Sequence, residues 1–232
     1  MPENVPGEAR SRAAARAAGA VLIGASVLEI GAMAHHPTAH AHDMAALLVQ
    51  LQALSAVSAW VHGVLIALML TVFFALTEFA WQRGITRPAI RAGLIAYAAG
   101  VVAMLGAALA DGFVTPRVAT LSTVVSATDL QVTAQLLKLC MLFNQALAHL
   151  GAVAMSVGIT AWSLDLVRGA GAERALGVFG AAIGLGSAGA LILGALQLDV
   201  HGMMLVLVLQ VIWTIGVGVL LLRIAQPHHP IP

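Results

Sequence analysis

Long apolar runs separated by short polar segments organise this chain. A helix needs roughly 20 predominantly apolar residues to cross a hydrocarbon core of about 30 Å. Six runs meet this requirement, and no proline interrupts any of them. They cover about 17–34, 43–82, 92–110, 129–167, 175–198 and 201–223. We therefore predict an all-α, polytopic membrane protein with six transmembrane helices in three hairpins. This domain would occupy residues 17–223, between tails at 1–16 and 224–232.

Two of these runs are much longer than a bilayer requires. At 1.5 Å per residue, helices over 43–82 and 129–167 would extend well past the hydrocarbon core. We expect both helices to project beyond the outer membrane face and to pack together there as a cap. Thr128 and Gln131 have the spacing of a capping box, so the second long helix is predicted to start at Asp129. The preceding segment contains Pro116 and is expected to be a longer connection.

Composition supports the same environment. Only 9% of the residues are charged, 60% are apolar, and the mean hydropathy is +0.96. Soluble domains carry about 25% charged residues, so a lipid bilayer is the expected surrounding. The net charge of +1 argues against a nucleic-acid partner, which would require a basic face. Cys140 is the single cysteine, which excludes an intrachain disulfide and a thiolate zinc cage.

The placement of basic residues predicts the orientation. Cytoplasmic loops of membrane proteins are enriched in lysine and arginine. In a six-span arrangement only Arg117 and Lys138 fall on one side. The other nine basic residues fall on the opposite side: Arg10, Arg12, Arg16, Arg83, Arg87, Arg91, Arg168, Arg174 and Arg223. Both termini are therefore expected in the cytoplasm, and the protein in the plasma membrane, with a bacterial inner membrane as the expected location.

The first apolar run also resembles a secretory signal peptide. Basic residues precede it, and Ala32-Met33-Ala34 has the small-x-small form of a cleavage site. Cleavage there would make His35 a new N-terminus, where an amino group and an imidazole could chelate copper. Glu29 interrupts the apolar stretch, which favours an uncleaved first span.

Histidines cluster between the first two spans. Imidazole is the commonest metal ligand in proteins, and short histidine-rich tracts are typical of metal sites. The tract holds four of the nine histidines in the chain: His35, His36, His40 and His42. His40 and His42 are expected to be solvated on the loop. His228 and His229 lie in the C-terminal tail, on the opposite side of the membrane from this tract.

Further ionisable residues fall at the same depth as this tract. Counting about 20 residues back from the inner end of each span places them all in the outer third of the membrane. The odd spans each bring an acidic residue, and the even spans each bring a histidine close to a glycine. Imidazole and carboxylate ligands suit iron, copper, zinc or manganese. The predicted metal ligands are Glu29, His35, His36, His62, Asp111, His149, Asp199 and His201, with Ser58 and Gln145 orienting the ligating rings.

Other interpretations of these residues stay open. His62 and His149, at equal depth on different helices, could instead be axial ligands of a b-type haem. Glu29 inside a span costs on the order of 3 kcal/mol to bury, which makes it a functional candidate. Glu78 can pair with Arg83 or reach the membrane interface. Methionine thioethers near histidine would favour Cu(I), although packing is the simpler role for them. The four tryptophans are expected mainly as interface anchors near span ends.

The sequence therefore predicts a site without predicting a reaction. The first hypothesis is a membrane metal- or haem-binding protein, redox-related, with a site of histidines and carboxylates near the outer, periplasmic face. The alternatives are a proton- or cation-coupled transporter and an accessory subunit of a larger membrane complex. The glycine-rich span 175–198 could serve helix contacts inside the bundle, or between protomers or subunits. Whether the protein is an enzyme is not determined by these features.

Overall fold

A computed structural model describes residues 6–39, 41–121 and 126–224 of the chain. Its elements are α1 (Pro6–Ala34), α2 (Met44–Arg83), α3 (Pro88–Leu109), η1 (Ala110–Val114), α4 (Thr115–Leu121), α5 (Ala127–Leu166), α6 (Ala172–Ile192) and α7 (Val200–Ile224). Six helical stretches are long and apolar enough to cross a membrane, as the apolar runs predict. α1 begins within the predicted tail at 1–16. His40, His228 and His229 lie outside the described residues.

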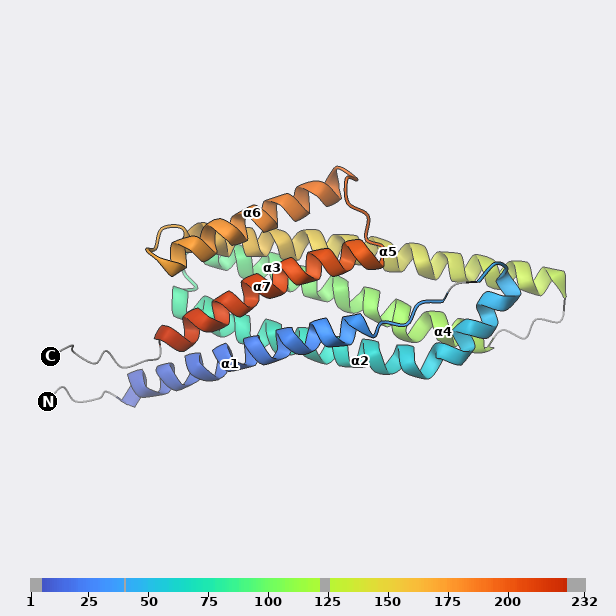
Figure 1. Ribbon diagram of the computed structural model, residues 1–232, viewed down its shortest axis with the longest axis horizontal. Helices are drawn as coiled ribbons and strands as arrows, with labels where there is room; N and C mark the ends of the chain where they lie inside the picture. Colours follow the sequence, from blue (N-terminus) through green and yellow to red (C-terminus); the bar gives the residue numbers. More distant parts are fainter. Residues whose placement is uncertain (1–5, 40, 122–125, 225–232) are drawn as a thin grey trace, which may run out of the picture.

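The long helices lie side by side, and α1 begins at the same end of the bundle at which α7 ends (Figure 1). α5 packs against α3 on one side and α6 on the other, while α1 packs against α2 and α7. At the opposite end, α2, α5 and the short α4 extend past the ends of α1 and α7 (Figure 1). The core therefore lies between two groups of helices. α1 with α2 and α7 forms one group, and α5 with α3 and α6 forms the other.

Glycines bring α3 and α5 into backbone contact. A Cβ atom at Gly100 would lie 2.9 Å from the carbonyl oxygen of Gly151, and one at Gly158 would lie 2.9 Å from that of Gly93. Small residues permit this approach in membrane helices, where dispersion rather than the hydrophobic effect holds the pair together. The contact fixes α3, and with it the turn that follows α3, against α5.

The segment after α3 differs from the predicted long connection. It continues as the π-helical turn η1 and then as α4, so helical structure reaches Leu121. Pro116 lacks an N–H group, and the first turn of a helix, where it lies, is the position that tolerates this loss. Thr115 donates its hydroxyl to the carbonyl oxygen of Ala110 at 2.9 Å, across the widened turn. The prediction failed because Asp111 and Gly112 were taken as the end of the helix, whereas helical structure continues through them as a wider turn.

An apolar cluster joins the ends of α2, α4 and α5, where the sequence predicts a cap. Its buried members are Leu48, Ala119 and Leu137, with Met44, Leu51, Val118 and Leu130 packed against them. Asp43 caps α2 by accepting a hydrogen bond from the Ala46 amide at 2.8 Å. α5 is capped by Ser126 rather than by Thr128, and the Ser126 hydroxyl accepts from the Asp129 amide at 3.2 Å. The start of α5 therefore precedes the predicted one.

The other end of the bundle is held by an ionic network that the sequence interpretation missed. Arg83 donates to Asp165 at 2.7 Å and to Glu173 at 3.1 Å, and Arg87 donates to Asp165 at 3.1 Å. Of the two roles expected for Glu78, pairing with Arg83 is not observed, because Glu78 accepts a hydrogen bond from Gln82 at 2.6 Å. The network connects the end of α2 to α5 and to the start of α6.

The expected interface role fails for two of the four tryptophans. Trp162 and Trp213 have no exposed surface and lie parallel, with ring centroids 6.0 Å apart. Trp162 donates its indole N–H to the Ile90 carbonyl oxygen at 3.0 Å. In α6, Gly177 and Gly184 contact the backbone of α5, so these two glycines serve packing inside the bundle.

Candidate metal centre

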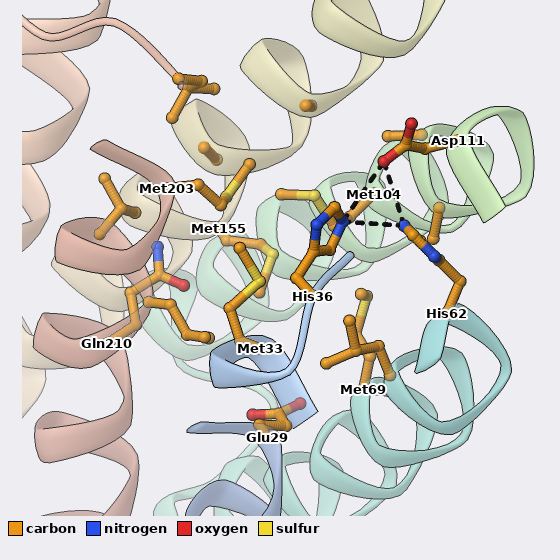
Figure 2. A pocket seen from close by; sticks show the side chains of 18 of the residues that line it. Glu29, Met33, His36, His62, Met69, Met104, Asp111, Met155, Met203 and Gln210 are labelled. Atoms are coloured by element: carbon orange, nitrogen blue, oxygen red, sulfur yellow. Dashed lines mark hydrogen bonds and ion pairs between the residues drawn. The ribbon is translucent and has the colours of Figure 1, made fainter. Parts of the chain in front are cut away.

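Three side chains from three different segments converge near the junction of α1 and α2. His62 lies on α2 and is 4% exposed. Asp111 lies in the π-helical turn η1, which re-aims side chains that a regular helix would direct elsewhere. His36 follows the last turn of α1, where its amide donates to the Met33 carbonyl oxygen at 3.1 Å. These residues form one group whose ligand atoms could hold a metal ion (Figure 2).

The three ligand atoms form a nearly equilateral triangle. His36 Nε2 lies 3.2 Å from His62 Nε2 and 3.3 Å from Asp111 Oδ2. His62 Nε2 lies 3.2 Å from the same carboxylate oxygen. In a tetrahedral site with bonds of 2.0–2.1 Å, ligand atoms lie about 3.3–3.4 Å from one another. One face of such a tetrahedron therefore fits the triangle with a contraction of about 0.1–0.2 Å.

The hydrogen bond on the far side of the His62 ring determines what this triangle can bind. His62 Nδ1 donates to the Ser58 carbonyl oxygen at 2.8 Å. A neutral His62 then carries its lone pair on Nε2, which faces the triangle, and a carboxylate offers only lone pairs. A backbone carbonyl partner of this kind is the usual support for a metal-ligating histidine. The Ser58 hydroxyl lies farther away, at 3.5 Å, so the Ser58 backbone orients the ring more closely than its side chain does.

The three side chains offer too few hydrogen-bond donors for the contacts that they make with one another. Among the described residues, the Nδ1 atom of His36 is buried and has no hydrogen-bond partner. A proton on His36 Nε2 could be donated to His62 Nε2 or to Asp111 Oδ2, but the contact between those two acceptor atoms, at 3.2 Å, would still join two lone pairs. An added proton on one of the three groups, or a metal ion coordinated by all of them, would satisfy this contact.

Gly112 makes room for His62, and it was not among the residues predicted from the sequence. A Cβ atom at Gly112 would overlap Cβ of His62 and lie 2.5 Å from its Cγ. The adjacent Asp111 can therefore approach the imidazole only because its neighbour has no side chain. The sequence could not have predicted this role of Gly112, because the close approach of α2 to η1 arises only when the helices pack.

Glu29 and Asp199 line the same cavity but do not join the triangle. Glu29 is 9% exposed, and no hydrogen bond or ion pair to its side chain occurs within the described residues. Asp199 is exposed and accepts a hydrogen bond from the Gly202 amide at 2.8 Å at the start of α7. Asp199 thus acts as a helix-capping residue in this geometry, whereas Glu29 is a buried carboxyl group without a partner.

The remaining predicted residues lie outside the triangle. His35 is exposed and bonds the Gly31 carbonyl oxygen at 2.8 Å, while His149 and His201 are exposed on α5 and α7. Gln145 lines the cavity and donates to the Leu198 carbonyl oxygen at 3.4 Å, so it orients no ligating ring here. His62 faces His36 and Asp111 rather than His149, and this arrangement does not support the haem pairing.

A cavity of about 360 Å³ extends from the triangle into the bundle. α1, α2, α3, α5 and α7 all contribute to its wall, which is mostly apolar. Figure 2 shows Glu29 and Gln210 on this wall together with several methionines. The triangle thus lies at the edge of a partly open cavity that could admit another molecule or ion.

No protein-family model, curated protein or solved structure matches this chain.

Proposed function

We propose that this integral membrane protein binds a transition-metal ion through His36, His62 and Asp111. The convergence of their three ligand atoms at 3.2–3.3 Å carries the proposal. Two imidazoles and one carboxylate are a ligand set found with zinc and non-haem iron, and three protein ligands leave a position open for an exogenous group. The cavity borders the triangle, so an exogenous group could reach the ion, as the redox-related role that we propose would require.

We further propose that the centre lies near the outer, periplasmic face of a bacterial inner membrane. Arg83 and Arg87 lie at the other end of the bundle, where α1 begins and α7 ends (Figure 1). Basic residues favour the cytoplasmic side, so both termini are placed there. The ends of α2 and α5 would then project past the outer face and shield the centre from bulk water.

Metal analysis of the detergent-purified protein tests this function. Wild-type protein purified from cells grown with added zinc, copper, iron or manganese is expected to carry about one ion per chain. Asp111→Asn keeps the side-chain shape but removes the charge, and loss of a ligand or its immediate support typically reduces metal affinity about 10–100-fold. His149→Ala is the matched control and should retain the ion. Wild-type protein without metal, or equal metal in all three proteins, would contradict the proposal.

A proton- or cation-coupled transporter is a second candidate, and Glu29 favours it. This buried carboxyl group lacks a partner within the described residues and lines the cavity that reaches the triangle. Intramembrane carboxyl groups commonly mark ion pathways. Proteoliposomes with a pH-sensitive dye inside would show proton flux for wild-type protein and none for Glu29→Gln. Equal, background flux in both would remove this candidate and leave metal binding unaffected.

A further inference from the structure

Methionines are concentrated on the wall of the cavity. The chain contains nine methionines, and five of them line this space: Met33, Met69, Met104, Met155 and Met203. They come from α1, α2, α3, α5 and α7, so each helix that lines the cavity contributes one (Figure 2). Four of them are half-buried, and Met155 is buried.

Packing alone gives no reason for this arrangement. Methionine is used in protein interiors because its flexible side chain fills irregular gaps. Here the five side chains surround a space of about 360 Å³ that remains after they have packed. Their thioether sulfur atoms are polarisable ligands of low charge, and such ligands select soft metal ions.

Charge favours a monovalent ion at this place. Two neutral imidazoles and one carboxylate carry a single negative charge, so a monovalent cation gives a neutral centre. A divalent ion would leave one positive charge on the triangle, which is costly in an apolar setting unless Glu29, the buried carboxyl group on the same cavity wall, also carries its charge. Cu(I) is the monovalent ion of biological use whose preferred ligands include both imidazole and thioether groups.

We propose that the methionine-lined cavity is a Cu(I) site, in which cavity thioethers complete the coordination of an ion held by His36, His62 and Asp111. This inference rests on the proposed metal-binding function and specifies its metal. In this proposal the cavity thioethers supply the ligand that the triangle leaves open, and zinc would not need sulfur there. The selectivity for Cu(I) would therefore come from the thioether ligands of the cavity wall and not from the triangle.

A titration under anaerobic, reducing conditions tests this proposal. The detergent-purified wild-type protein competes with a chromophoric Cu(I) chelator, and a parallel titration measures Zn(II) binding. Met69→Leu/Met104→Leu and Met33→Leu/Met155→Leu/Met203→Leu conserve volume and hydrophobicity while removing sulfur. Both variants should bind Cu(I) at least tenfold more weakly while their Zn(II) affinity changes less than twofold. Met141→Leu, at an exposed site, is the control for both metals.

X-ray absorption at the copper edge supplies an independent result. Wild-type protein loaded with one equivalent of Cu(I) should show sulfur scatterers, and their number should fall in the methionine variants. Unchanged Cu(I) affinity, or nitrogen and oxygen scatterers alone, would overturn the inference while leaving the metal function intact. Parallel loss of Cu(I) and Zn(II) in the methionine variants would also overturn it, because the thioethers would then only shape the triangle. If wild-type protein binds neither metal, both proposals fail.

Discussion

At the triangle, each side chain is held by a different local feature. The Ser58 carbonyl oxygen fixes the His62 ring, a π-helical turn directs Asp111, and the end of α1 positions His36. Counting along the spans identified all three residues by their depth in the membrane. It also identified His149 and His201, which lie elsewhere, because depth along a helix says nothing about how that helix is rotated against its neighbours. Only the packed bundle selects three residues from the predicted set.

The space beside Gly112 gives a prediction at the same scale. Gly112→Ala would force His62 away from Asp111, because the added Cβ overlaps the His62 side chain. The variant should lose at least tenfold in metal affinity, as expected when the support of a ligand is disturbed. Gly63→Ala is the control, because its nearest contact would be the Phe113 ring at an ordinary 3.9 Å. Isothermal titration with zinc measures both, and equal affinity in the two variants would refute the positioning role of Gly112.

Among the elements, the long apolar helices could be predicted and the junctions between them could not. Apolar runs of sufficient length identify spans whatever their neighbours are, and all six predicted spans occur as helices. The turn η1 follows directly on α3, whose glycine contacts with α5 are tertiary contacts that no local pattern reveals. Arg83 likewise pairs with residues of α5 and α6 that are remote in sequence, whereas only its neighbour Glu78 was considered.

The ionic network should stabilise the junction of α2, α5 and α6. Asp165 is 2% exposed, so Asp165→Asn leaves Arg83 without its strongest partner in a partly buried position. We expect a loss of about 3 kcal/mol in the free energy of unfolding. This value is the lower end of the range for a broken buried ion pair, because Arg87, the second partner of Asp165, is more than half exposed. Denaturant unfolding in detergent micelles measures this loss. Arg91→Ala, at an exposed position of the same basic segment, should change stability by less than about 0.5 kcal/mol.

Asp165→Asn also separates stability from function. Arg83 follows His62 by 21 residues on α2 and so lies about 30 Å from it along the helix, and zinc affinity of the folded variant should therefore equal that of wild type. A variant that is stable but has lost zinc would show that the two ends are coupled.

For the whole molecule, the even number of spans brings the start of α1 and the end of α7 to one end of the bundle (Figure 1). From the distribution of basic residues we predict that this end faces the cytoplasm, because packing alone does not distinguish the two sides of the membrane. The cavity and triangle follow from the packing of five helices, and no single helix carries enough of the pattern to predict them.

Labelling of single cysteines tests this orientation. Cysteines at Thr38, Thr86 and Ala170, each exposed, would be introduced one at a time into a Cys140→Ser background. Ala170 is preferred to Gly171, whose φ of 56° strains any other residue. A membrane-impermeant maleimide added to spheroplasts should label position 38 alone. Labelling of 86 or 170 without 38 would invert the topology, and labelling of 38 together with 86 would contradict the six-span arrangement.

The central claim is that one ion is shared by His36, His62 and Asp111. Diffraction from crystals of zinc-loaded protein, measured on both sides of the zinc absorption edge, tests it most directly because it locates the ion. We predict a single strong anomalous peak about 2.0–2.2 Å from Nε2 of both histidines and from one Asp111 oxygen. A peak at His35, His149 or His201 instead, or ordered triangle side chains with no peak between them, would contradict the claim.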